Sequence, residues 1–253
     1  MMRPALLLLA AAALAAPLSA QSDPPKGPPK PSELVLQTVC PISGEELTGA
    51  VGETEVLYEG HRVRLCCAKC VGEFNAFPDA AIYSLYRAGQ KAENVQTTCP
   101  ITGEELGDDY RSVWVMNKEL RVCCKKCEAK ASKDPATYFD QLEGRRQQTR
   151  CPVLGGEIDP EVSSVVQGQR VYYCCPGCDQ KMKADPGKFF AEAAKDKVVF
   201  EPAGSMCPVM EEPNEDKLWW VTYQSRRIHF CCRKCVGRFT KDPGKYLAGS
   251  DVG

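Results

Sequence analysis

Short runs of alternating apolar and polar residues recur four times along the chain, each directly before two adjacent cysteines. The residues one and three places before each cysteine pair are apolar: Val63 and Leu65, Leu120 and Val122, Val171 and Tyr173, and Ile228 and Phe230. A period of two places such side chains on one face of an extended strand. The pattern therefore predicts four equivalent strands, each with one buried face.

Turn residues in front of these strands predict that each is the second strand of a β-hairpin. In the third copy we expect strands at 162–166 and 170–174, joined by Gln167-Gly168-Gln169. The equivalent turn positions are Gly60, Asn117 and Ser225. Glycine and asparagine tolerate the backbone of tight hairpin turns.

Two short helices are predicted after each hairpin. The first carries an apolar residue one turn after the last cysteine: Phe74, Met182 or Phe239. Three copies then have an aspartate before a proline, typical of the cap and first residue of a second helix: Asp134-Pro135, Asp185-Pro186 and Asp242-Pro243. The first copy has the reversed order Pro78-Asp79, with its aromatic residues at Tyr83 and Tyr86.

All sixteen cysteines of the 253-residue chain belong to this repeated pattern. Each copy has a Cys-Pro, then the cysteine pair, then a cysteine four residues after the first member of the pair. The sets are Cys40, Cys66, Cys67 and Cys70; Cys99, Cys123, Cys124 and Cys127; Cys151, Cys174, Cys175 and Cys178; and Cys207, Cys231, Cys232 and Cys235. We define repeats 1 to 4 as residues 33–89, 94–143, 149–195 and 198–249.

A glycine four residues after the first cysteine predicts a tight knuckle with a left-handed residue in three repeats: Gly44, Gly103 and Gly155. Repeat 4 has Glu211 there, so we expect a different knuckle. Modules of about fifty residues rarely hold together without a metal or disulfides. We therefore predict an α+β protein of four tandem treble-clef/zinc-ribbon-like modules, each with a Cys knuckle, a β-hairpin and two short helices. The sequence leaves open whether the modules pack together.

Cysteines on a knuckle and at a helix start are typical of small metal-binding modules. The helix N-terminus favours the thiolate over the thiol, and two cysteines four residues apart lie on one side of a helical turn. Each repeat is therefore a candidate metal site for about one ion.

One repeat carries a family resemblance in Cys151-Pro152-Val153, in Tyr172-Tyr173-Cys174-Cys175-Pro176-Gly177-Cys178 and in Asp185-Pro186-Gly187-Lys188-Phe189. With minor changes, all four repeats resemble the TRASH/YHS group of heavy-metal-binding domains. The resemblance implies heavy-metal trafficking, resistance or sensing. It also implies three ligands in each repeat: Cys40, Cys66 and Cys70; Cys99, Cys123 and Cys127; Cys151, Cys174 and Cys178; and Cys207, Cys231 and Cys235.

The fourth cysteine of each repeat leaves the ligand set open. Many knuckles of this type have a ligand three residues after the first cysteine, where this chain has Ser43, Thr102, Leu154 and Met210. The extra thiol instead lies in the cysteine pair: Cys67, Cys124, Cys175 and Cys232. Neighbouring strand residues point to opposite faces unless the backbone turns there. Four thiolates would suit Zn(II), and three would suit Cu(I).

Three further side chains are weighed as ligands. His229 lies two residues before Cys231 and is a candidate, whereas His61, in a hairpin turn, is expected to be solvated. Met210 would favour copper in repeat 4, although a methionine in such a place more often belongs to the core.

Disulfides are the alternative use of these cysteines. Each repeat also contains the C-x-x-C spacing of redox-active pairs, but no thioredoxin-like βαβ pattern surrounds it. A bridge between adjacent cysteines is strained, and a bridge from the knuckle to the helix would leave two thiols over. A disulfide-stapled structural or protein-interaction array without metal therefore remains the alternative.

The first 33 residues predict export. Residues 1–20 have Arg3, an apolar run and Leu18-Ser19-Ala20, as in a signal peptide, and residues 21–33 read as a polyproline-like linker. We expect a periplasmic or extracellular protein with no stable membrane span.

Composition limits the kinds of partner that this protein can be expected to bind. A formal net charge of −1, without a basic tract, gives nucleic-acid binding no support. The sequence has only two histidines and no phosphate-binding loop, so it gives no support to a catalytic function. We therefore predict that the protein is not an enzyme. The expected function is sequestration or delivery of Cu(I) or Zn(II), with metal ions as ligands and a metal transporter or metalloenzyme as a fitting partner.

Overall fold

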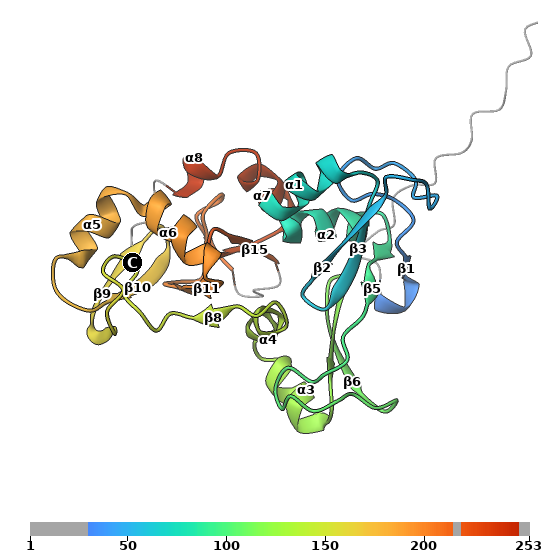
Figure 1. Cartoon of the computed structure of the whole chain (residues 1–253), viewed down its shortest axis with the longest axis horizontal. Helices are drawn as coiled ribbons and strands as arrows, with labels where there is room; N and C mark the ends of the chain where they lie inside the picture. Colours follow the sequence, from blue (N-terminus) through green and yellow to red (C-terminus); the bar gives the residue numbers. More distant parts are fainter. Residues whose placement is uncertain (1–29, 215–218, 248–253) are drawn as a thin grey trace, which may run out of the picture.

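The computed structural model describes residues 30–214 and 219–247. The expected signal peptide and most of the linker lie outside these residues. The linker's last three residues form a short 3₁₀ helix, η1 (Pro31–Glu33), instead of the expected polyproline-like chain. In the described part, eight α-helices and several small sheets give the mixed α+β class expected from the sequence. Figure 1 shows the helices and sheets gathered into adjoining small bodies along the chain.

Repeats 1 and 2 have the same order of elements. In repeat 1 these are β1 (Val35–Leu36), β2 (Thr54–Tyr58), β3 (His61–Leu65), α1 (Ala68–Ala76) and α2 (Pro78–Arg87), and β4 (Gln90–Lys91) follows in the connection to repeat 2. In repeat 2 they are β5 (Glu93–Asn94), β6 (Arg111–Val115), β7 (Lys118–Val122), α3 (Lys125–Ala131) and α4 (Pro135–Leu142). β2 pairs with β3, and β6 with β7, in antiparallel hairpins. β5 extends the first hairpin, which links the two repeats.

Repeats 3 and 4 follow the same plan. The segment β8 (Arg146–Gln147) leads into β9 (Asp159–Val166), β10 (Gln169–Tyr173), α5 (Cys178–Ala184) and α6 (Pro186–Lys195). The elements that follow are β11 (Val198–Val199), β12 (Glu201–Pro202), β13 (Met206–Cys207), β14 (Glu212–Pro213), β15 (Trp219–Tyr223), β16 (Arg226–Phe230), α7 (Arg233–Phe239) and α8 (Pro243–Leu247). β12 joins the edge of the third hairpin, as β5 joins the first.

The predicted hairpins and helix starts are confirmed. In the third hairpin the turn is Gln167-Gly168, both with positive φ, and Gln169 already belongs to β10. Asp134 and Asp185 accept backbone N–H bonds from Thr137 and Lys188 as helix caps. In repeat 1, where the sequence lacks this aspartate, α2 starts at Pro78 without a side-chain cap.

Each repeat has its own apolar core built on the predicted residues. All eight apolar hairpin residues of the four second strands are at most 6 % exposed, and Phe74, Met182 and Phe239 are buried beside them. Three of these cores also take side chains across repeat boundaries: Trp220 of repeat 4 packs into the core of repeat 2, Tyr83 of repeat 1 into that of repeat 4, and Phe200 of repeat 4 into that of repeat 3. The hydroxyl of Tyr83 donates to the Trp220 carbonyl at 2.9 Å. The modules therefore pack together.

The residue directly after each hairpin turn is polar and buried, and it contacts a neighbouring repeat. The four residues are His61, Lys118, Gln169 and Arg226, each at most 2 % exposed. His61 accepts the Glu119 N–H at 3.2 Å, and Gln169 donates to the Arg227 carbonyl at 3.1 Å. Arg226 donates to Gln167 and lies over the Phe190 ring. We call these four residues the joint residues.

Lys118 is the centre of a buried network of charges. Its ammonium lies 2.6 Å from a Glu59 oxygen and 3.1 Å from an Asp79 oxygen, and all three side chains are fully buried. Arg145 bridges Glu59 and Asp140 at 2.9 Å each, and Arg227 of repeat 4 contacts Asp140 as well. Burial alone raises the pKa of Glu59, but Lys118 and Arg145 bring it down to about 2. Removing one partner would therefore leave buried charges unpaired.

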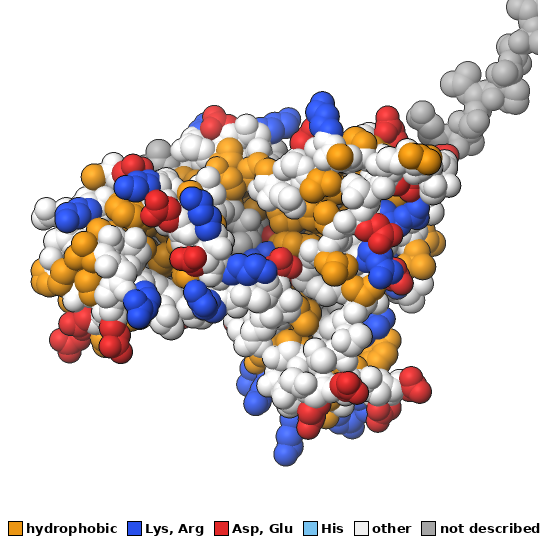
Figure 2. Space-filling model, in the orientation of Figure 1, with side chains coloured by type: hydrophobic (Ala, Val, Ile, Leu, Met, Phe, Trp, Pro, Cys, Tyr) orange, Lys and Arg blue, Asp and Glu red, His pale blue; other side chains and the backbone are white. Residues whose placement is uncertain are grey.

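No helix in the described ranges has the length and apolar character needed to span a bilayer. Figure 2 shows basic and acidic side chains interspersed over the visible face, as the near-zero net charge implies.

Candidate metal centres

The knuckle of each repeat is closed by the same backbone hydrogen bond. The N–H of the residue four places after the first cysteine donates to that cysteine's carbonyl, at 2.9 Å in repeat 1 and 2.8 Å in the other three. Gly44, Gly103 and Gly155 have φ between 72° and 79°. Glu211 adopts φ 57° and makes the same bond. The expectation of a different fourth knuckle was therefore wrong, because a single non-glycine residue can occupy this region at a modest cost.

A glutamine three residues before the first cysteine ties three of the knuckles to their hairpins. The side-chain amide of Gln37 donates to the carbonyls of Val39 and Arg64, and its oxygen accepts the Arg64 N–H. Gln96 and Gln148 make the same three bonds in repeats 2 and 3. Repeat 4 has Gly204 there. Sequence analysis missed this clamp, although the recurrence of glutamine at one offset was a visible signal.

Three sulfurs of each repeat converge. The groups, whose Sγ atoms all lie within 4.8 Å of one another, are Cys40, Cys66 and Cys70; Cys99, Cys123 and Cys127; Cys151, Cys174 and Cys178; and Cys207, Cys231 and Cys235. These are the twelve cysteines that the resemblance implied. In every group the first and last cysteines are buried and the middle one is half-buried. We call these groups the inner sets.

The sulfur spacing fits a metal ion. Metal–thiolate bonds of 2.3 Å in a tetrahedral site place two sulfurs about 3.8 Å apart. The sulfurs of Cys66 and Cys70 are 3.6 Å apart, and those of the equivalent pairs in repeats 2 and 4 are 3.7 Å apart. A trigonal site has nearly the same spacing, so four groups can each hold one ion while the distances do not select zinc or copper.

In repeats 1 to 3 the knuckle lowers the pKa of its own cysteine and so favours the thiolate. Burial raises the pKa of Cys40, but backbone N–H donors from the knuckle and from Cys66 outweigh burial and bring it down to about 7. The pKa of Cys99 is lowered to about 7 in the same way, because hydrogen bonds to its sulfur outweigh burial. At the helix, burial and neighbouring sulfurs raise the pKa of Cys127 and Cys178 to about 12. An arriving cation would therefore meet one thiolate and displace protons from the other thiols.

The remaining cysteine of each repeat lies beside the inner set. Cys67 Sγ is 3.5 Å from Cys70 Sγ and 3.9 Å from Cys66 Sγ, but it is not a member of the inner set. The corresponding sulfur separations from the last cysteine are 3.6 Å for Cys175 and 3.7 Å for Cys232. Cys124 is exposed, and the other three are half-buried. All sixteen cysteines are free thiols in the structure.

The residues in place of a second knuckle ligand divide the repeats into two kinds. The hydroxyls of Ser43 and Thr102 lie 3.3 Å and 3.5 Å from the sulfurs of Cys66 and Cys123. Leu154 and Met210 are exposed instead. The Met210 sulfur, weighed above as core or copper ligand, is thus not core, and it lies 3.6 Å from an Arg238 nitrogen.

Neither histidine joins an inner set. His61 is 1 % exposed, which contradicts the expectation of a solvated ring. Its Nδ1 lies 2.8 Å from the Glu59 carbonyl and its Nε2 accepts from Glu119, so the ring is neutral. Burial is the main cause that lowers its pKa to about 4. The sequence could not reveal this because the partner belongs to repeat 2.

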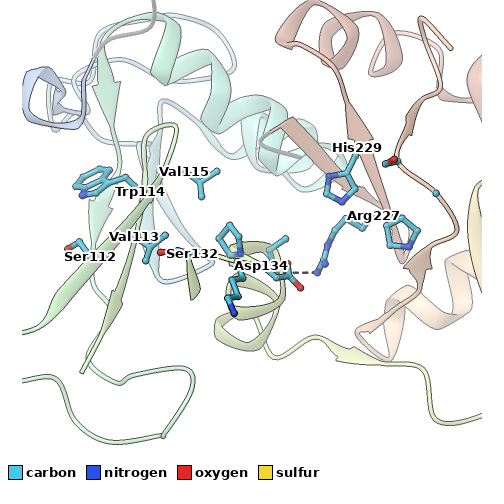
Figure 3. Close-up of a pocket in the computed structure, with 14 residues that line it drawn as sticks. Ser112, Val113, Trp114, Val115, Ser132, Asp134, Arg227 and His229 are labelled. Atoms are coloured by element: carbon cyan, nitrogen blue, oxygen red, sulfur yellow. Dashed lines mark hydrogen bonds between the residues drawn. The ribbon is translucent and has the colours of Figure 1, made fainter. Parts of the chain in front are cut away.

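His229 faces a cavity of about 1030 Å³ between repeats 2 and 4. Figure 3 shows His229 and Arg227 on one side of this cavity, with Asp134 and the strand residues Ser112 to Val115 across from them. No cysteine lines it. His229 therefore lies apart from the Cys207 group that the sequence suggested it could join.

Comparison with known proteins adds no relative. No protein-family model, no curated protein and no solved structure matches this chain.

Proposed function

We propose that this protein is an exported metal-binding array that sequesters or delivers Cu(I) or Zn(II), with one ion in each of four thiolate sites. The observation that carries the proposal is the convergence of three sulfurs, from a knuckle and a helix start, in all four repeats. One chance cluster of thiols would be weak support. Four clusters built with the same hydrogen bonds are strong support.

The resemblance to TRASH/YHS domains points the same way. The order of knuckle, hairpin and cysteine-bearing helix is that of a treble-clef or zinc-ribbon module, which we propose as the fold of each repeat. The apolar leader supports export to the periplasm or the cell exterior. We propose binding without turnover, because the feature common to all four repeats is a group of thiol ligands.

The alternative is a disulfide-stapled array without metal. The helix-start pairs, such as Cys67 and Cys70 with sulfurs 3.5 Å apart, are the nearest candidates for oxidation. A metal site and a disulfide respond to different reagents. Ligand thiols become reactive when a chelator removes the ion, whereas disulfide sulfurs react only after reduction.

The test is metal content by elemental analysis of the protein recovered from its exported compartment, with thiols counted before and after chelation. We expect close to one ion per repeat and thiols that react only after chelation and denaturation. Absence of metal, with thiols that appear only after reduction, would refute the proposal and establish the disulfide array.

A pair of variants in repeat 3 sharpens this test. Cys178→Ser removes a buried member of an inner set and should lower the metal content by about one quarter. Cys175→Ser removes the neighbouring thiol outside that set and should leave the metal content unchanged. Full metal content in Cys178→Ser would show that the three-sulfur group does not hold the ion.

A further inference from the structure

In repeats 1 and 3 the cysteine outside the inner set lies close to two sulfurs of that set, and in repeat 4 Cys232 lies 3.7 Å from Cys235. In repeat 1, the separations among Cys66, Cys67 and Cys70 are 3.5, 3.6 and 3.9 Å. In repeat 3, Cys175 lies 3.8 Å from Cys174 and 3.6 Å from Cys178. All of these separations are close to the value of about 3.8 Å that metal–thiolate bonds require. We call such a group, of the cysteine pair and the last cysteine, the outer set.

The two sets differ in their access to solvent. The first cysteines, which belong only to the inner sets, are at most 2 % exposed: Cys40, Cys99, Cys151 and Cys207. The cysteines that belong only to the outer sets are half-buried or exposed. The two residues between them and the last cysteine are exposed in every repeat: Ala68 and Lys69, Lys125 and Lys126, Pro176 and Gly177, and Arg233 and Lys234. A sulfur of another molecule can therefore approach the outer set directly.

We propose that Cys67, Cys124, Cys175 and Cys232 are exchange thiols, through which a bound ion leaves the inner set for a thiol acceptor. This inference rests on the proposed function. The ion stays bonded to the two shared sulfurs during this first exchange, and the acceptor's thiols displace those two sulfurs afterwards. Its bond to the knuckle sulfur breaks as a bond to the exchange thiol forms.

The step changes no oxidation state. The exchange thiol releases its proton to solvent when it becomes a ligand, and the freed knuckle sulfur returns to its own equilibrium with solvent protons. Each acceptor thiol then loses a proton to solvent as it binds the ion, and each protein thiolate that leaves the ion is free to take one up from solvent. Ligand exchange through intermediates that keep two bonds intact avoids releasing a bare ion into water, which is why a spare thiol beside a buried site would speed the transfer.

The surroundings of the outer sets indicate the acceptor's charge. Basic side chains are exposed between the exchange thiol and the last cysteine in three repeats: Lys69, Lys125, Lys126, Arg233 and Lys234. Positive charge near an entry point attracts negatively charged molecules and raises their rate of encounter. The acceptor is therefore a cysteine thiol with acidic groups close to it.

The test is the transfer of zinc from the full chain to dimercaptosuccinate, an anionic molecule with two thiols. The variant changes Cys67, Cys124, Cys175 and Cys232 to serine together. We expect it to keep four zinc ions at equilibrium and to transfer them at least ten times more slowly than the unchanged chain. The single changes Cys124→Ser and Cys175→Ser should each slow the transfer of about one quarter of the zinc ions. They replace the fourfold variant in this test if that variant folds poorly.

Each other outcome overturns the inference in its own way. Transfer within twofold of the unchanged rate would show that these thiols do not exchange the ion. Loss of zinc from the fourfold variant at equilibrium would make them resident ligands. Eight ions in the unchanged chain would mean that the outer sets hold ions of their own. A chain that takes up no metal under any loading condition would refute the proposed function, and the exchange role with it.

Discussion

Repeats 2 and 3 hold the same three converging sulfurs in different surroundings. Around the repeat 2 site lie Thr102, Glu104, Lys125 and Lys126. The same positions in repeat 3 are Leu154, Gly156, Pro176 and Gly177. The joint residues also differ in charge. Lys118 of repeat 2 belongs to a buried network of charges, whereas the side chain of Gln169 in repeat 3 makes one neutral hydrogen bond.

Repeats 2 and 3 share the geometry of their cysteines but differ in the charges around them. The cysteine spacing and the knuckle are common to both repeats, and they are sufficient to bring the sulfurs together. Charge at the rim and at the joint varies independently of that geometry. We therefore expect metal capacity to be alike in the two repeats, while stability and exchange rate differ.

The largest expected effect is at the joints. Lys118→Met removes a buried cation and leaves Glu59 and Asp79 without their common partner, so it should lower the free energy of unfolding by about 3–5 kcal/mol. Gln169→Met in repeat 3 loses a neutral hydrogen bond and should lower it by about 1 kcal/mol. Urea unfolding of the metal-loaded chains, followed by tryptophan fluorescence, measures both. Equal losses would contradict the contrast between a charged and a neutral joint.

A smaller effect concerns pH at the joint of repeat 1. The pKa of His61 is lowered by burial to about 4 from 6.5, so the unfolded chain binds its proton more readily than the folded chain. This group contributes stability above pH 6.5, and the contribution falls as the pH drops toward 4, by about 3 kcal/mol in total. The pKa of the Glu59 carboxyl is 4.5 in the unfolded chain and about 2 in the folded chain, so its contribution to stability is lost mainly as the pH falls below 4.5 and changes little in the upper part of this window.

His61→Gln tests this pH dependence, because it gives repeat 1 the kind of joint that repeat 3 has. Between pH 4.5 and 6.5 the stability of the variant should depend less steeply on pH than that of the unchanged chain. The difference between the two slopes is the measurement, since all other titrating groups are common to both proteins. Parallel slopes would show that His61 is not held neutral.

The smallest effect is at the rim of the repeat 3 site. Pro176→Lys places a positive charge where repeat 2 has Lys125, and it should raise the rate of zinc transfer to dimercaptosuccinate by about twofold at low salt. The experiment uses a chain with Cys67, Cys124 and Cys232 changed to serine, so that repeat 3 alone transfers rapidly. Pro176→Ser is the uncharged control. A gain that persists at high salt would exclude a charge effect.

Local patterns predicted the local structure well. The alternation at Val171 and Tyr173 indicated a strand with one buried face, and Asp185-Pro186 indicated where one helix ends and the next begins. Both are confirmed because their causes lie within a few residues. The twelve converging cysteines were indicated by spacing together with a family resemblance.

Contacts between repeats were not predictable in the same way. The burial of His61 and the network around Lys118 depend on residues 39 to 59 positions away. Glu211 was misread because glycine is favoured, but not required, where a single residue takes a left-handed conformation. The glutamine clamp was visible in the sequence, but its meaning depended on the carbonyls that folding brings beside it.

The four joint residues have a consequence for how this chain can be rebuilt. The metal sites are near copies, so the repeats look interchangeable, but His61, Lys118, Gln169 and Arg226 differ in chemistry and each contacts particular residues of other repeats. Deleting repeat 2, or swapping it with repeat 3, would keep intact cysteine sets while placing an unmatched charge in a dry interface. The contacts of the joint residues thus fix the order of the repeats. Adding or deleting a whole repeat would change the number of metal sites only at the cost of these contacts.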